Sequence, residues 1–290
     1  GMSPVARPEL VAAVSEAGGL GVLGAAGMDP ETITQSINHI RDLTSKPFGV
    51  DILLPQATAQ VADLKQPGSS NRDAGGLPQQ YVDFQTEARS QFDLPETTPT
   101  PQRGHAAFGA EGFSKMQVQA IIDAKTPVFA SGLGNPAPFV EAFHENGTTV
   151  IALVGNVKNA IRVRDGGADI IVAQGTEAGG HTGRIGTLAL VPQIVDVAEG
   201  RPVLAAGGIG DGRGLAASLA LGAEGVWCGT AFLATDEAHL PQVLKDRVID
   251  ANEEDTRITR LYSGKTMRNV TNPLIEMWEA SGISALPMGA

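Results

Sequence analysis

Short apolar runs alternate with helical segments along most of this chain, and this alternation limits the possible folds more than any other feature. The runs are rich in Val, Ile, Leu and Ala, as in Ile170-Ile171-Val172. Buried strands that alternate with helices predict an all-parallel sheet in an α/β protein. The predicted strands are residues 20–23, 48–54, 128–130, 149–154, 169–173, 203–205 and 225–228.

The segments between these runs carry helix signals. Pro8 suits a first helical turn and Gly18-Gly19 follows the last one, while Asp29-Pro30 is an N-cap followed by proline. Apolar residues at helical spacing give the second helix one buried face, made of Ile33, Ile37, Ile40 and Leu43. Besides this helix after Asp29-Pro30, the predicted helices are residues 8–17, 57–65, 114–124, 136–146, 157–165, 190–198 and 213–221.

The seven predicted strands are one short of the eight that close a TIM barrel. The last two strand-end loops, Gly207-Gly208 and Gly229-Thr230, have the character of the phosphate-binding loops that follow the seventh and eighth barrel strands. This numbering places the remaining strand before residue 1, with Gly1-Met2 at its end. We therefore expect one α/β domain over residues 1–290, a TIM (β/α)8 barrel whose first strand this chain lacks.

Two regions depart from the alternation. Residues 66–113 are rich in Gly, Pro, Gln, Ser and Thr, and they predict either a lid or a disordered insertion with one helix around 78–90. Residues 236–290 predict a C-terminal extension that is helical in pieces, with basic and polar residues around Lys265 and Arg268.

The composition excludes several classes of function. A formal net charge of −11 argues against nucleic acid or an anionic membrane surface as a partner. The single cysteine, Cys228, rules out an internal disulfide and a multi-cysteine metal site. No signal peptide precedes Pro8 and no apolar run is long enough to span a bilayer, so we expect a cytoplasmic protein without a metal site. The unpaired edges of an incomplete barrel would favour a homo-oligomer.

Glycine-rich loops follow three of the predicted strands. The first is Gln174-Gly175-Thr176-Glu177-Ala178-Gly179-Gly180-His181, where the glycines let a ligand approach the backbone. Gly207-Gly208 and Gly229-Thr230 each offer backbone N–H groups, and each opens a helix whose N-terminal dipole favours an anion. Either pair alone is most simply a tight turn, but two on consecutive strands favour a phosphate-bearing ligand. Neither fits the Walker or the dinucleotide pattern, so FMN fits better than ATP or NAD.

His181 is the one histidine in a glycine-rich strand-end loop, and it is the candidate catalytic residue. An imidazole with an ordinary pKa of about 6.5 suits proton transfer near neutral pH. His39, His144 and His239 fall in helical segments and are predicted to be surface or packing residues, whereas His105 lies in the insertion. The plain alternative for His181 is a solvated loop side chain.

Four further side chains are candidates for contact with a ligand. Gln174 could contact a flavin ring or be a satisfied loop amide, and Glu177 could orient a neighbour or, as we prefer, face solvent. Asp51 is a mid-strand carboxylate that is costly to bury alone, so it is expected to meet a partner or a ligand. Met2 either belongs to the core or lines the ring.

These loops resemble those of a known family, the nitronate monooxygenases, formerly called 2-nitropropane dioxygenases. The similarity covers nearly the whole chain, more weakly through 66–113, and it is carried by the motifs Gly1-Met2, Glu16-Ala17-Gly18-Gly19-Leu20-Gly21, Glu177-Ala178-Gly179-Gly180-His181-Thr182-Gly183, Ala205-Ala206-Gly207-Gly208-Ile209 and Gly229-Thr230-Ala231-Phe232-Leu233-Ala234-Thr235. The resemblance implies a barrel that binds FMN noncovalently. It implies a phosphate site at Gly207, Gly208, Gly229 and Thr230, a ring and ribityl site at Met2, Asp51, Gln174, Gly179 and Gly180, and a catalytic role for His181.

In such enzymes the histidine is proposed to take the α-proton of a nitroalkane or to position the nitronate. The nitronate then gives an electron to FMN, reduced flavin meets O₂, and a carbonyl compound and nitrite result. The chain departs from the family in two respects: it lacks the strand that usually precedes Gly1-Met2, and Asp51 stands where many members carry asparagine.

Two alternatives to this function remain open. Flavin-dependent enoyl-acyl-carrier-protein reductases share the glycine–histidine motif, so the first is an NAD(P)H-dependent flavin reductase acting on an enoyl thioester or a quinone. The second is an inactive barrel that holds no flavin stably.

Overall fold

The computed structural model describes residues 2–54, 78–94 and 112–286. The predicted helix 57–65 and most of the predicted insertion lie outside these residues. Within them, no helix is both long enough and apolar enough to cross a membrane.

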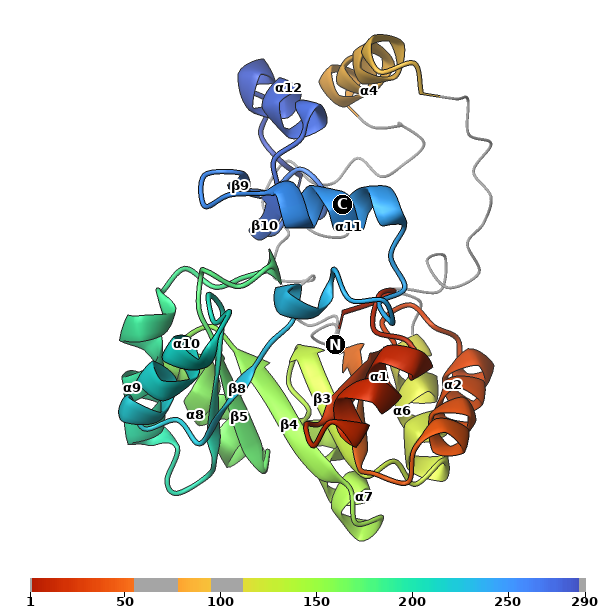
Figure 1. Ribbon diagram of the computed structural model, residues 1–290, viewed down its shortest axis with the longest axis vertical. Coiled ribbons are helices and arrows are strands. Elements are labelled where there is room, and N and C mark those ends of the chain that lie inside the picture. Colours follow the sequence, from red (N-terminus) through yellow and green to blue (C-terminus); the bar gives the residue numbers. More distant parts are fainter. Residues whose placement is uncertain (1, 55–77, 95–111, 287–290) are drawn as a thin grey trace.

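The described strands build one curled parallel sheet, as predicted (Figure 1). Its seven strands follow each other in chain order, apart from the short β6, which belongs to a second sheet. Every neighbouring pair in the large sheet is parallel, and the described part of the chain leaves its first and last strands unpaired with each other. The strands are β1 (Gly21–Gly24), β2 (Phe48–Leu53), β3 (Val128–Leu133), β4 (Thr149–Val154), β5 (Ile170–Gln174), β7 (Val203–Ala206) and β8 (Gly225–Trp227). The α/β barrel-type fold is thus confirmed.

Helices cover the outer face of the sheet and begin where the sequence supplies caps. The Asp29 carboxylate accepts a hydrogen bond from Thr32 N at 2.8 Å, and Asn156 caps its own helix in the same way. Ile33, Ile37 and Ile40 are fully buried as predicted, but Leu43, expected on the same face, is 44% exposed. These helices are α1 (Pro8–Glu16), α2 (Pro30–Leu43), α6 (Phe113–Asp123), α7 (Val140–Glu145) with the preceding 3-10 turn η1 (Ala137–Phe139), α8 (Val157–Asp165), α9 (Thr187–Val197) and α10 (Gly212–Ala220).

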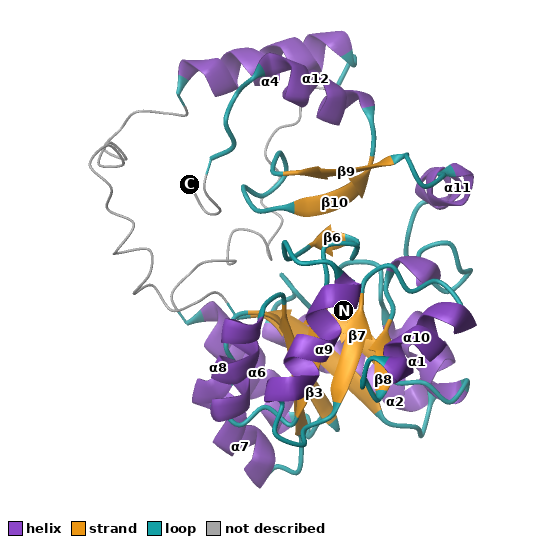
Figure 2. Ribbon diagram, turned by 90° about the vertical axis from the view of Figure 1, so that its left-hand side faces the viewer, coloured by secondary structure: helices purple, strands orange, loops and turns teal. Residues whose placement is uncertain are grey.

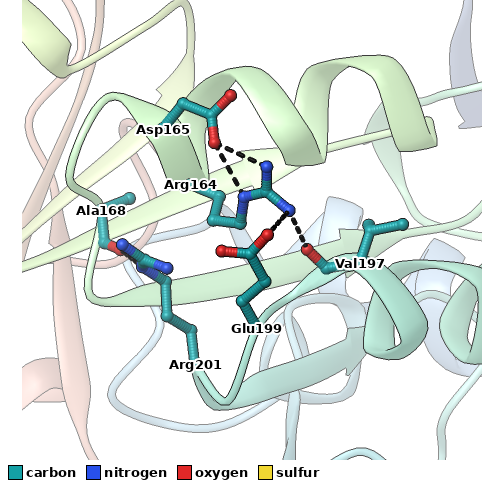
Figure 3. Close-up of polar contacts among 6 residues, drawn as sticks. All are labelled: Arg164, Asp165, Ala168, Val197, Glu199 and Arg201. Carbon is teal, nitrogen blue, oxygen red and sulfur yellow. Dashed lines mark hydrogen bonds and ion pairs between the residues drawn. The ribbon is translucent and has the colours of Figure 1, made fainter.

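Arginines fasten the loops that lead into the amino ends of β5 and β7 (Figure 3). Arg164, at the end of α8, donates to the carbonyl oxygen of Val197 at 2.8 Å and pairs with Glu199 at 2.8 Å. Arg201 donates to the carbonyl oxygen of Ala168 at 2.8 Å. Backbone carbonyls that no ladder or helix uses are thereby satisfied at this end of the sheet.

The C-terminal extension contains strands that the sequence analysis missed. Thr256–Thr259 (β9) and Met267–Val270 (β10) form an antiparallel pair, and β10 also pairs with β6 (Gly180–His181), which lies in the loop after β5. The expectation of helical pieces holds for α11 (Gln242–Asp250) and α12 (Pro273–Ser281), and it is wrong for the strands between them. The strands form because distant segments pair, and local periodicity does not report such pairing.

A helix of the insertion packs on this extension. The structure places α4 at Gln79–Gln91, close to the predicted 78–90, and Figure 2 shows it beside α12 at the far side of β9 and β10 from the barrel. Tyr81 of α4 stacks on Trp278 with ring centroids 6.5 Å apart, and Phe84 meets the same ring edge to face at 5.1 Å. The Tyr81 hydroxyl donates to the carbonyl oxygen of Ser284 at 2.7 Å. Helix α4 and the described part of the extension therefore form one layer above the carboxyl ends of the barrel strands.

Candidate functional site

Three glycine-rich loops meet at the carboxyl ends of β5, β7 and β8. A Cβ placed on Gly179 would lie 2.6 Å from the Oγ1 of Thr230, and one on Gly207 would lie 2.8 Å from the backbone nitrogen of Ala178. A Cβ on Gly208 would likewise approach the Cβ of Glu177 to 3.1 Å. The loops can approach so closely only because these positions carry no side chain.

The backbone N–H groups of these loops are candidate donors to an anion. For the N–H groups of Gly179, Gly207, Gly208 and Gly229, the described part of the chain provides no hydrogen-bond acceptor. Gly207 and Gly208 have φ values of +104° and +71°, a backbone conformation that glycine adopts readily and other residues rarely do. Together with the Thr230 hydroxyl, these donors fit a phosphate group.

The helix ends contribute less to this cradle than the sequence suggested. α10 begins at Gly212, and its first N–H groups are already capped, since the Asp211 carboxylate accepts from Arg213 N at 2.9 Å and Gly214 N at 3.4 Å. Thr230–Phe232 (η2) is only a short 3-10 turn. The candidate donors to an anion are therefore loop amides and not a free helix terminus.

His181 lies two residues beyond Gly179 on the small second sheet, and its side chain is part-buried. Its Nε2 lies 2.8 Å from the Oγ of Ser263, and it faces Met267 in the β6–β10 ladder. Burial lowers the pKa of His181, and the positive charge of Lys265 lowers it further. The imidazole is therefore neutral near pH 7 and has a lone pair that can accept a proton. The solvated-loop alternative is wrong for this residue.

The residues that hold His181 come from the C-terminal extension, and the sequence analysis did not select them as site residues. Ser263 and Lys265 stand in the turn between β9 and β10. Thr182 N donates to the carbonyl oxygen of Thr266 at 3.1 Å, and the Thr266 hydroxyl returns a bond to the carbonyl oxygen of Thr182 at 3.0 Å. The β-branched alternation of Thr256-Arg257-Ile258-Thr259 was the one local signal that a strand could lie here.

Glu177 is exposed, as preferred, but it also orients a neighbour. Its carboxylate accepts from both the N–H and the hydroxyl of Thr187 at 2.8 Å, which starts α9 three residues before the predicted 190. Burial alone would raise the pKa of Glu177, but these bonds and the charge of Arg268 outweigh it and lower the pKa. Arg268 also donates to the carbonyl oxygen of Thr176 at 3.2 Å, so the extension fixes this loop as well.

Asp51 lies on β2, separated from β5 by β3 and β4, and it is buried. A Cβ on Gly132 would come within 2.8 Å of the Asp51 Oδ1, so glycine at the end of β3 makes room for the carboxyl group. Burial raises the pKa of this carboxyl and is the largest influence on it. A protonated carboxyl can donate a hydrogen bond, as an asparagine amide at the same position could.

Met2 and Gln174 complete the set of predicted site residues. Met2 lies between the two edge strands, since a Cβ on Gly229 would lie 3.4 Å from the Met2 sulfur and one on Gly24 would meet the Met2 backbone. Met2 also packs against a small apolar cluster around Val5. Gln174 is the last residue of β5 and is half-buried.

The curled parallel sheet with its glycine-rich loops defines an α/β barrel-type protein, and the comparisons with known proteins agree with this class. A sequence profile described as nitronate monooxygenase matches residues 1–289. The chain belongs to the nitronate monooxygenase family. It is therefore an oxidoreductase of a flavin-dependent class.

Three proteins illustrate the similarity. A Mycobacterium tuberculosis protein named as a monooxygenase is 41% identical over 278 residues, which are 93% of this chain and 73% of that protein. The nitroalkane oxidase from Streptomyces ansochromogenes is similar in structure with a TM-score of 0.79 at 30% identity, over 99% of this chain and 80% of that one. FabK from Thermotoga maritima has a TM-score of 0.72 at 34% identity, over 94% of this chain and 70% of that one.

Proposed function

We propose that this protein binds FMN noncovalently and oxidises alkyl nitronates or nitroalkanes with O₂ to a carbonyl compound and nitrite. One observation carries the proposal: the part-buried His181 ring, held by Ser263, lies two residues from a group of loop N–H groups that find no acceptor in the described part of the chain. A phosphate anchor beside a base is the arrangement that such a reaction needs. Membership of the nitronate monooxygenase family supports the same reaction.

Within this proposal the FMN phosphate binds the loop amides and the Thr230 hydroxyl. FMN would supply the redox chemistry, carrying electrons from the substrate to O₂. The proposed residues are Gly207, Gly208, Gly229 and Thr230 for the phosphate, and Met2, Asp51, Gln174, Gly179 and Gly180 for the ring and ribityl chain. Residues 1–290 act as one domain in this proposal.

His181 acts as the base that takes the α-proton of a nitroalkane, or positions a nitronate that is already formed. Because burial and Lys265 hold its pKa below the ordinary value, most of the imidazole is unprotonated near pH 7. The exposed Lys265 ammonium also attracts an anionic substrate toward this side chain.

A reductase is the second candidate function. The structural similarity to FabK and the glycine–histidine motif shared with flavin-dependent reductases favour it. In that case NAD(P)H would reduce the bound flavin rapidly without O₂ and nitronate would not. Anaerobic stopped-flow spectra with each reductant separate the two functions.

The first experiment measures flavin absorbance after the protein is incubated with FMN and desalted, followed by nitronate turnover. Retained flavin and nitrite release support the proposal. A colourless protein after desalting would contradict it and favour an inactive barrel.

The residue-level test replaces His181 by asparagine. We expect nitroalkane turnover to fall by about 100-fold or more, because general-base catalysis is lost, while flavin is retained. The matched control is His144→Asn, since His144 lies on α7 and pairs with Asp169 at 3.0 Å away from the cradle. Unchanged nitroalkane turnover in His181→Asn would refute the role of His181.

A further inference from the structure

Ser263 contacts three groups around one hydroxyl. Its Oγ lies 2.8 Å from His181 Nε2, 3.3 Å from the Met267 sulfur and 3.4 Å from the backbone nitrogen of Lys265. Met267 is also the residue opposite His181 in the β6–β10 ladder. The hairpin that docks on β6 therefore brings both the hydroxyl and the sulfur to the same imidazole.

A count of protons selects one arrangement of these contacts. A serine hydroxyl has one proton and two lone pairs, and the thioether sulfur can only accept. The Lys265 N–H donates to one lone pair. If the hydroxyl proton points to the Met267 sulfur, the second lone pair accepts from His181 Nε2–H and all three contacts are hydrogen bonds. If the proton points to Nε2 instead, the sulfur has no donor in this group.

The same arrangement is prepared for proton uptake. When a neutral Nε2–H imidazole takes a second proton at Nδ1, its bond to the Ser263 oxygen becomes charge-assisted and stronger. The hydroxyl does not have to rotate, because its proton already points to the sulfur. In the opposite tautomer the hydroxyl would first have to turn away from Nε2.

We propose that Ser263 and Met267 hold His181 as the Nε2–H tautomer, so that Nδ1 is the atom that accepts the substrate proton. Only the last clause rests on the proposed function. In that step the substrate C–H bond breaks, an Nδ1–H bond forms, and the electron pair of the broken bond stays with the substrate and delocalises into the nitronate. Ser263 and Met267 are positioning residues, since they act through His181.

The test is the ¹⁵N NMR spectrum of the His181 ring, which distinguishes a protonated ring nitrogen from an unprotonated one. The full chain is used after saturation with FMN, at a pH above the titration of His181, and the His181→Asn variant identifies the signals. We expect Nε2 protonated and Nδ1 unprotonated in the unchanged protein. A protonated Nδ1 would overturn the proposal.

Two substitutions sharpen this test. Met267→Leu keeps the apolar volume but removes the sulfur acceptor, so the hydroxyl is free to turn to Nε2, and we expect the Nδ1–H tautomer to increase severalfold. Ser263→Ala removes the partner altogether, and we expect a mixture of both tautomers. If both variants kept the spectrum of the unchanged protein, the proposal would be wrong.

A loosened hairpin could also disturb the ring, and Thr266→Val controls for this. It removes the Thr266 bond to the carbonyl oxygen of Thr182 while leaving Ser263 and Met267 in place. We expect a lower melting temperature and an unchanged tautomer. A tautomer shift of equal size in Thr266→Val would assign the effect to docking and overturn the positioning role. Because NMR needs no turnover, a failure of nitronate oxidation leaves this result intact.

Discussion

The two ends of the barrel treat their polar groups in opposite ways. At the amino ends of β5 and β7, Arg164 and Arg201 bond to the carbonyls of Val197 and Ala168 and satisfy them (Figure 3). At the carboxyl ends, the N–H groups of four loop glycines find no acceptor in the described part of the chain. One end bonds its backbone polar groups within the chain, whereas the other leaves backbone N–H groups available to the proposed ligand.

The same contrast holds for the titratable groups. The Arg164 side chain is 15% exposed and pairs with Asp165 and Glu199 at 2.7 and 2.8 Å, so its charge is neutralised within the chain. His181 at the other end is held by a neutral hydroxyl, and burial and a nearby cation keep it uncharged. Substitutions at the two ends should therefore affect different measurements.

The largest expected effect comes from Gly207→Ala at the carboxyl end. The new methyl would lie 2.8 Å from a backbone nitrogen, so the loop must move, and we expect FMN affinity to fall by about 100-fold. Titration of FMN followed by flavin fluorescence measures this. The matched control is Gly200→Ala at the amino end, where φ is +79° and no atom lies within 4 Å. Gly200→Ala introduces the same kind of backbone strain as Gly207→Ala. If both variants lost FMN affinity equally, the difference between the two ends of the barrel would be refuted.

Arg164→Met should give the reverse result. The variant leaves the Val197 carbonyl and Glu199 without this partner, and we expect about 1–3 kcal/mol of lost stability by chemical denaturation with unchanged FMN affinity. Arg213→Met is the control, because Arg213 forms a single ion pair with Asp211 and is 93% exposed. Weakened FMN binding in Arg164→Met would show that the two ends are coupled.

The sequence predicted the strands and loops of the barrel better than the layer that α4 and the C-terminal extension form above them. The strands and the glycine loops are local patterns, and all seven strands of the large sheet were found within a few residues. The partner of His181 was missed, because Ser263 follows it by 82 residues and only strand pairing brings the two together. The start of α9 was also missed, because the carboxylate that caps it belongs to Glu177, ten residues before Thr187 and outside the usual N-cap position.

The roles of Asp51 and Met2 needed three dimensions as well. The sequence marked Asp51 as a costly buried carboxylate, and burial is confirmed. It could not show that Gly132 of the next strand makes room for it. Met2 was left between a core and a ring role, and the structure places it beside both Val5 and Gly229.

Asp51→Asn tests how much the buried carboxyl group on β2 lowers the stability of the protein. Burial raises the folded-state pKa of Asp51 above 3.8, so the native state holds its proton more tightly than the unfolded state does. Stability is therefore unaffected below the unfolded pKa and declines as the pH rises through the folded pKa. We expect the asparagine variant to be more stable near pH 7 by on the order of 1 kcal/mol, with the difference vanishing in acid. Thermal unfolding across pH measures this, and a less stable variant near pH 7 would contradict it.

The smallest effect is expected for Lys265→Met, and it isolates the cation near His181. Burial is the larger cause of the lowered His181 pKa and Lys265 the smaller, so removing the charge should raise the midpoint of the acid limb of kcat/KM. Because Lys265 is exposed and its charge is screened, we expect this rise to be small. Added salt should also raise this midpoint in the unchanged protein and should leave it unchanged in Lys265→Met. The control is Lys158→Met on α8, whose midpoint should respond to salt as that of the unchanged protein does. If salt still raised the midpoint in Lys265→Met, a charge other than Lys265 would lower the pKa of His181. The electrostatic difference between the two ends of the barrel would then not come from Lys265.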